Sequence, residues 1–236
     1  MPHPARRQRG AALLLLLLLL GLGAAALLMG AFGRPDPGPR ERATLAALAG
    51  AREALLGYAA RTGRLPRPAA SALDGRESAR PCATGADCAG FLPWVTLGVD
   101  GTDSWGHLLR YSVAPDFTGA TVPAAQALAD KRVLTRRGGA LAPAAGQDGC
   151  TVASPCAAAV IFSSGARRLG TAATGIAAAD RGDDNADERR NDAAGSDFVG
   201  RAASEAGAPG GAFDDLVLPL PAPLLYRRMG AAGTLR

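Results

Sequence analysis

The chain has 236 residues and a formal net charge of +5 at pH 7, with 26 Lys and Arg residues against 21 Asp and Glu residues. The arginines are scattered among acidic residues with little aromatic interleaving, so no nucleic acid partner is expected. Beyond the first 33 residues, about 200 residues remain, which is enough for one domain with its own core.

The first 33 residues predict a membrane segment. Three arginines precede Gly10, and no charged residue occurs from Ala11 to Gly33. A helix over residues 11–32 would be roughly 33 Å long, and the hydrocarbon core of a bilayer is about 30 Å thick. We therefore expect a basic leader over residues 1–10 and a transmembrane helix over residues 11–33. Because the basic arm should stay in the cytoplasm, the rest of the chain should be exported.

A secretory signal peptide is the alternative for the same segment. Residues 13–20 form a plausible apolar core, and Ala24-Ala25-Ala26 resembles a cleavage site between small residues. The apolar run alone does not separate the two interpretations.

The next segments predict a break and then an amphipathic helix. Residues 34–40 are rich in proline, which removes backbone donors and interrupts helices. Helical periodicity resumes over residues 41–62, Gly63 suits the C-cap, and Pro66 excludes continuation. An amphipathic helix of this kind packs on its own domain.

The remaining residues, 63–236, predict an α+β head with a small antiparallel sheet. Short apolar or alternating runs suggest strands, the polar residues 178–196 suggest an exposed loop, and residues 213–226 suggest an extended arm leading to a short terminal helix. The strand-like runs are residues 91–99, 108–113, 132–135 and 157–162.

Four cysteines, Cys82, Cys88, Cys150 and Cys156, occur as two local pairs in loops. An even number of cysteines in an exported chain favours disulfides, and three connectivities are open. Pairing within each local pair would cost little loop-closure entropy. Zinc is the alternative, but thiolate ligands to zinc are usually separated by two to four residues.

Three motifs in order along the chain resemble those of the type IV pilin-like proteins and, in particular, the type II secretion pseudopilins. Arg9-Gly10-Ala11 before the apolar run resembles a prepilin peptidase site, and residues 51–66 resemble the end of the pilin helix. The stretch Asp103-Ser104-Trp105-Gly106, followed by Tyr111, resembles the D-x-W-G-…-Y signature of pseudopilins. As a local structure, Asp103 would accept backbone hydrogen bonds and Gly106 would permit a tight bend.

The resemblance implies assembly into a filament of a type II secretion system or a type IV pilus. It implies cleavage after Gly10 and methylation of Ala11 by prepilin peptidase. The other implied partners are further pilin-like subunits and an inner-membrane assembly platform. The expected localisation is single-pass in the inner membrane, with the C-terminal head in the periplasm.

Two features depart from the family pattern. The family usually carries a glutamate at the fifth mature position, where its charge can pair with the N-terminus of a neighbouring subunit, but here that position is Leu15. At a filament tip no partner lies above the subunit, and an unpaired charge in lipid would be costly, so a subunit without the glutamate can sit there. The resemblance then favours a minor or tip subunit. The prolines between Pro35 and Pro39 are the second departure, and they argue against one continuous long helix.

The acidic segment suggests a calcium site, since clustered carboxylates and amides suit that ion. The resemblance supports this expectation, because major pseudopilins bind calcium in a loop near the end of their sheet. The expected ligands are Asp183, Asn185, Asp187 and Asp192. The segment lacks the glycine and final glutamate of the EF-hand pattern, and neighbouring arginines offer the alternative of a solvated charged loop.

Catalysis is not expected. After the leader there is one histidine, His107, and the chain has no G-x-S-x-G nucleophile motif. Ser163-Ser164-Gly165 has no base paired with it in sequence, and carboxylate pairs such as Asp214-Asp215 are common by chance. The alternative function is a periplasmic binding or adhesion domain with an ordinary signal peptide or membrane anchor.

Overall fold

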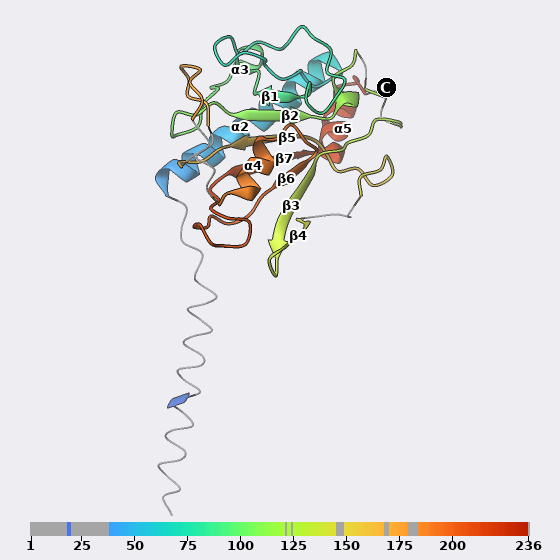
Figure 1. Ribbon diagram of the computed structural model, residues 1–236. Coiled ribbons are helices and arrows are strands. Elements are labelled where there is room, and N and C mark those ends of the chain that lie inside the picture. The colour runs from blue at the N-terminus through green and yellow to red at the C-terminus, as the bar shows by residue number, and fades with distance from the viewer. Residues whose placement is uncertain are drawn as a thin grey trace, which may run out of the picture. The chain divides into compact units, whose positions relative to one another are not determined.

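A computed structural model describes residues 18–19, 38–120, 122–123, 125–144, 149–167, 170–178 and 184–235. The chain divides into two compact units, Met1–Gly38 and Pro39–Arg236. The elements of the second unit are drawn in Figure 1. They are α2 (Pro39–Thr62), β1 (Ala89–Phe91), α3 (Trp94–Leu97), β2 (Arg110–Val113), the 3-10 helix η1 (Pro115–Phe117), β3 (Arg132–Arg137), β4 (Ala140–Pro143), β5 (Ala157–Ser163), α4 (Ala186–Asp192), β6 (Asp197–Val199), β7 (Leu216–Pro221) and α5 (Ala222–Ala231).

Within these described ranges, no helix is long and apolar enough to cross a membrane. The longest described helix, α2, has charged residues in its first turn and its last turn, such as Glu41 and Arg61. This finding corrects both the predicted architecture with its transmembrane helix and the predicted single-pass inner-membrane localisation. Apart from Leu18 and Leu19, which are helical, the predicted span over residues 11–33 lies outside the described residues, as does the leader.

The helix predicted over residues 41–62 is confirmed as α2, which begins two residues earlier than predicted. Pro39 occupies its first turn, where a helix tolerates proline because the N–H would be unpaired there. Gly63 ends the helix with a φ of 75° and donates its N–H to the carbonyl of Ala59 at 2.9 Å. The buried side chains of α2 recur at helical spacing, and they are Thr44, Leu48, Ala51, Leu55, Leu56, Tyr58 and Ala59.

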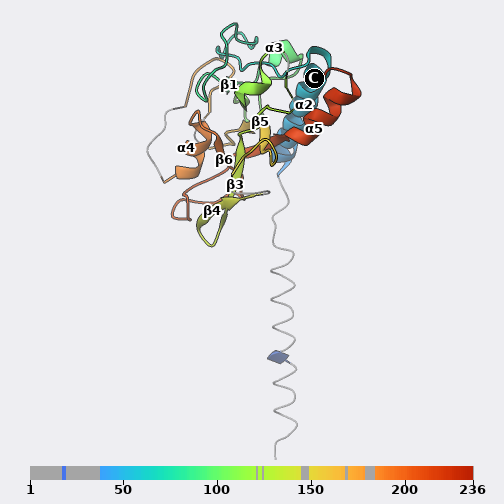
Figure 2. The same cartoon turned by 90° about the vertical axis from the view of Figure 1, so that its right-hand side faces the viewer.

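A four-stranded antiparallel sheet lies beside α2, in the order β1-β2-β5-β7. Helices α2 and α5 pack on one face of this sheet and on each other, as Figure 2 shows. The main core fills this layer, with Leu55 from α2, Tyr111 from β2 and Leu225 from α5 all buried. All seven residues of β5 are buried, which confirms that residues 157–162 form a strand covered on both faces.

A second, smaller core covers the other face of the sheet. The three-stranded sheet β4-β3-β6, in which β3 and β6 are parallel, supplies part of it. Phe162 of β5 and Phe198 of β6 meet there with ring centroids 5.9 Å apart. From Ala159 to Phe162, successive residues of β5 therefore alternate between the two cores.

Two predicted segments differ from the structure. The predicted strand over residues 91–99 stops at Phe91, because Pro93 and Gly98 bracket the short helix α3 instead. The predicted exposed loop over residues 178–196 contains α4, on which Asp187, Glu188 and Asn191 are buried. The predicted arm over residues 213–226 is the edge strand β7 followed by α5, and its prolines fit an edge position.

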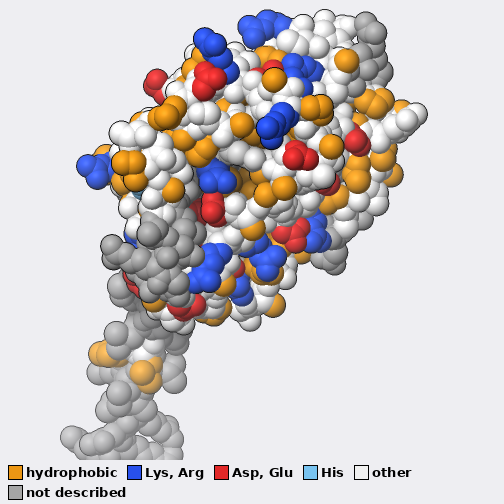
Figure 3. All heavy atoms as spheres, turned by 45° about the horizontal axis from the view of Figure 1, so that its top comes forward, with side chains coloured by type: hydrophobic (Ala, Val, Ile, Leu, Met, Phe, Trp, Pro, Cys, Tyr) orange, Lys and Arg blue, Asp and Glu red, His pale blue; other side chains and the backbone are white. Residues whose placement is uncertain are grey.

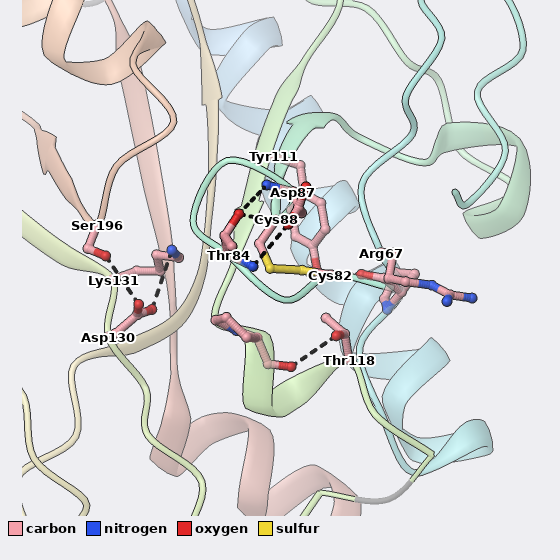
Figure 4. The surroundings of a disulfide bond; sticks show 12 residues. Arg67, Cys82, Thr84, Asp87, Cys88, Tyr111, Thr118, Asp130, Lys131 and Ser196 are labelled. Atoms are coloured by element: carbon pink, nitrogen blue, oxygen red, sulfur yellow. Dashed lines mark hydrogen bonds and ion pairs between the residues drawn. A yellow bond between two sulfur atoms is a disulfide. The ribbon is translucent and has the colours of Figure 1, made fainter. Parts of the chain in front are cut away.

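Both disulfides join local pairs, Cys82 to Cys88 and Cys150 to Cys156. Inside the first loop, Thr84 and Asp87 exchange side-chain and backbone hydrogen bonds, which are drawn in Figure 4. Disulfides are typical of proteins in oxidising compartments.

A buried hydroxyl joins α2 to the loop before β2. The Oγ1 atom of Thr44, which is wholly buried, accepts the backbone N–H of Ser104 at 3.1 Å. We expect Thr44→Val to lower the free energy of unfolding by about 1–2 kcal/mol, because the Ser104 N–H loses its acceptor. Urea unfolding measures this change, and Thr62→Val at the end of α2 is the matched control. An equal loss in both variants would contradict a specific role for this contact.

Candidate functional site

The D-x-W-G stretch forms a tight turn around a buried carboxylate. One oxygen of Asp103, Oδ1, accepts the backbone N–H groups of Trp105 and His107, each at 2.9 Å. Gly106 has a φ of 85°, a backbone conformation that residues other than glycine rarely adopt. Trp105 itself is only half-buried. The geometry gives Asp103 the expected turn-forming role.

The second oxygen of Asp103 holds the end of β5. Its Oδ2 accepts the hydroxyl of Ser163 at 2.5 Å, and Ser163 is wholly buried. The Nδ1 atom of His107 lies 2.9 Å from the carbonyl of Gly165 and 4.0 Å from Asp103 Oδ2. Ser163 therefore bonds directly to a carboxylate, and His107 contacts a backbone carbonyl. This is a structural junction between the turn and the sheet.

Tyr111 extends the same junction to the exit of α2. Its ring lies in the main core, and its hydroxyl donates to the carbonyl of Pro66 at 3.1 Å. Burial raises its pKa well above the usual value. Two residues of the pseudopilin-like signature thus bond to other elements, Asp103 to the end of β5 and Tyr111 to the exit of α2.

A separate cluster of three acidic groups lies between α4 and the start of β7. One carboxylate oxygen from each of Glu188, Asp214 and Asp215 lies within 4.8 Å of the others. Glu188 is 2% exposed and Asp215 is 5% exposed. Asn191 donates to Asp215 Oδ2 at 2.7 Å, and the backbone N–H of Asp214 donates to Glu188 Oε1 at 3.0 Å. The fold therefore brings three carboxylates from two segments into a largely buried site.

The environment of these groups disfavours their charged forms. Burial raises the pKa of Asp215 well above its usual value, and the Glu188 carboxylate adds to the effect. Burial also raises the pKa of Asp214 and of Glu188, the latter with a contribution from Asp214. Either protons or a cation would relieve the mutual repulsion of the three groups.

One buried oxygen in the cluster has no hydrogen bond within the described part of the chain. It is the buried Oδ1 of Asp214, whose other oxygen accepts the N–H of Ala166 at 3.0 Å. Hard cations such as Ca²⁺ prefer carboxylate and amide oxygens, so the donor set fits this ion. Glu188, Asp214 and Asp215 are the residues that would hold it.

Of the four residues predicted to bind calcium, the structure describes three, and arginines hold two of them. Asp187 is wholly engaged by two guanidinium groups, those of Arg136 and Arg201, at 2.8 and 2.7 Å. Burial would raise the pKa of Asp187, but hydrogen bonds from the two arginines outweigh it and lower that pKa. A carboxylate neutralised in this way is a poor metal ligand.

The other three predicted ligands differ in where they lie and in what they contact. Asp192 forms an ion pair with Arg110 at 2.8 Å, and Asp183 lies outside the described residues. Asn185 is buried beside the cluster, where its Nδ2 lies 3.4 Å from Glu188 Oε2. The fold therefore groups a different set of carboxylates from the predicted one, and the acidic segment contributes Glu188 to it.

Sequence reasoning passed over this cluster because its members are far apart in the chain. Glu188 and Asp214 are separated by 26 residues, and only the packing of α4 beside β7 joins them. A local signal did exist, since Asp214-Asp215 stands directly before the apolar strand β7.

No model of a known protein family, no curated protein and no solved structure matches this chain.

Proposed function

We propose that this protein is a pilin-like or pseudopilin-like subunit of a type II secretion or type IV pilus filament, in a minor or tip position. The observation that carries the proposal is the D-x-W-G turn and its connection to α2 and the sheet. Asp103 holds the turn, Ser104 bonds to Thr44 of α2, and Tyr111 bonds to Pro66 just beyond that helix. The packing of α2 on an antiparallel sheet is the part of the family's architecture that the described residues share.

On the face drawn in Figure 3, basic and acidic side chains are interspersed among apolar ones. The proposed partners are prepilin peptidase, other pilin-like subunits and an assembly platform.

Processing of the N-terminus tests the proposal directly. We expect that co-expression of the full chain with prepilin peptidase yields a protein that begins at a methylated Ala11. Intact-mass and peptide mass spectrometry of the mature N-terminus measure this product. The variant Gly10→Val should stay uncut, because the peptidase would act after Gly10.

Two other results would contradict the assembly function. A mature protein that starts near Leu27 would show signal-peptide cleavage, and an intact Met1 would show no processing. Either result would favour a periplasmic binding or adhesion domain. The pocket described below is the feature that such a domain would use.

We further propose that the cluster of Glu188, Asp214 and Asp215 binds Ca²⁺ in the head. A bound divalent cation would neutralise the carboxylates and fasten α4 to the segment before β7. Its role would be to stabilise the surface that contacts neighbouring subunits.

A further inference from the structure

An apolar pocket of about 500 Å³ lies between β3, the start of β5 and β7. Its walls include Val133 of β3 together with Val217, Pro219 and Pro221 on one face of β7. Val133 and Val217 also pack on the second core. The pocket is thus an unfilled continuation of that core, and its volume is in the range of small-molecule sites.

The charged residues in the described lining are both cationic. They are Lys131 and Arg132, and no carboxylate belongs to that lining. Arg132 is already engaged, since its guanidinium bonds to both oxygens of Asp197 at 2.7 and 2.6 Å. Lys131 is therefore the group to which a ligand would add a bond.

The ammonium of Lys131 makes no hydrogen bond to the residues that the structure describes, although it pairs with one carboxylate. Its side chain is 0% exposed. The nearest acid is Asp130, whose Oδ1 lies 3.4 Å from Nζ and whose Oδ2 accepts the hydroxyl of Ser196 (Figure 4). A buried ammonium without hydrogen bonds is costly, so an acceptor brought to it would bind favourably.

We propose that this pocket binds a small aliphatic carboxylate. The hydrocarbon part lies against the valines and prolines, and a change of the Lys131 rotamer brings Nζ to the carboxylate. Apolar contact supplies the affinity, and the charge-assisted hydrogen bond supplies the preference for an acid over a neutral molecule. This proposal is independent of the filament function.

Lys131 is the chain's only lysine, which gives the site its own spectroscopic signal. The purified full-length protein, labelled with ¹³Cε-lysine, is titrated with octanoate and, in parallel, with 1-octanol. We expect a saturable shift of the single Lys131 Cε signal with octanoate, and at least about tenfold weaker binding of octanol. Isothermal titration calorimetry gives the affinity and the stoichiometry.

Two variants test the pocket separately from the lysine signal. Lys131→Met keeps the side-chain volume and should weaken octanoate binding by at least about tenfold. Ala144→Trp, at an exposed position of the lining, should obstruct the pocket without removing a core group. Arg137→Met on β3 removes a charge from an exposed position outside the lining, and it should bind octanoate as the unmodified protein does.

Melting curves of each variant establish that it is folded before binding is compared. Absence of saturable octanoate binding to the unmodified protein would overturn the proposal. Equal affinity for octanoate and octanol would overturn the role of Lys131. Unchanged octanoate binding to Ala144→Trp would place the ligand elsewhere and would likewise overturn the proposed site.

Discussion

We expect Glu77→Gln to lower the free energy of unfolding by about 3 kcal/mol at pH 7. The carboxylate of Glu77, which is 12% exposed, accepts the hydroxyl of Tyr58 at 2.9 Å and two N–H groups of the Arg64 guanidinium at 2.5 and 3.0 Å. It also accepts the backbone N–H and Nε of Arg67. These bonds tie the loop around residue 77 to the end of α2.

The pKa of Glu77 gives the magnitude and the pH dependence. Burial would raise this pKa, but the hydrogen bonds from Arg64, Arg67 and Tyr58 outweigh burial and lower it from 4.5 to about 2. A lowered folded-state pKa stabilises the protein fully above the unfolded value, and this stabilisation is lost as the pH falls from about 4.5 through about 2. The amide of glutamine would direct an N–H group at donors, so it cannot replace the carboxylate.

Urea unfolding at pH 7 and at pH 2 measures the effect. The difference between the unmodified protein and Glu77→Gln should be large at pH 7 and should shrink strongly at pH 2. Glu53→Gln is the matched control, because Glu53 is 57% exposed and forms one ion pair with Arg228 at 2.8 Å. It should lose less than about 1 kcal/mol. Equal losses in the two variants, or a loss independent of pH, would contradict the assigned role of Glu77.

The local elements of the head could be predicted from the sequence because their signals are local. Helical periodicity with Gly63 at its end located α2, and the continuous apolar run located β5. The α3 helix was missed because a run of apolar residues fits a strand as well as a helix, and Pro93 and Gly98 decided between them.

The acidic segment shows why the candidate site could not be predicted in the same way. Its charge pattern is that of a solvated loop, and the neighbouring sequence does not indicate which arginines form ion pairs with Asp187. Those partners, Arg136 and Arg201, lie 51 and 14 residues away, and they make burial of the carboxylate tolerable. Glu188 then becomes buried on the same helix and meets Asp214 through tertiary packing.

Helix α4 therefore has two opposite electrostatic environments, whereas the sequence suggested one solvated charged loop. At Asp187 the positive charges outnumber the carboxylate, and its pKa is lowered. At Glu188 the neighbouring charges are acidic, and its pKa is raised. The pKa values of these adjacent residues therefore shift in opposite directions, because successive side chains of a helix point in different directions and have different neighbours.

The second large effect concerns the proposed binding of Ca²⁺ to this acidic cluster. We expect Ca²⁺ at about one hundred times its dissociation constant to raise the free energy of unfolding by about 3 kcal/mol at pH 7.5, and chelation with EDTA to reverse the gain. The reason is that the three carboxylates repel one another in a buried site, and a cation bound only by the folded state stabilises that state.

The pH dependence without calcium has a defined sign. Burial raises the folded-state pKa values of Glu188, Asp214 and Asp215 above their usual values of 4.5, 3.8 and 3.8. The folded protein then binds more protons than the unfolded chain. The contribution of these three groups to the free energy of unfolding is therefore fully present below their usual pKa values, and it is lost as the pH rises through the higher folded-state values. Calcium should suppress this loss, because it replaces the protons.

Variants separate the cluster from the rest of α4. Asp215→Asn should raise the stability of the calcium-free protein at pH 7.5, since it removes one buried charge, and it should abolish most of the gain from calcium. Asp192→Asn, on the same helix but paired with Arg110, should keep the full calcium response. Calorimetric unfolding with calcium, with magnesium and with EDTA measures all three proteins. An unmodified protein whose unfolding is indifferent to calcium would refute the cation site, and a calcium response that survives in Asp215→Asn would locate the ion at other residues.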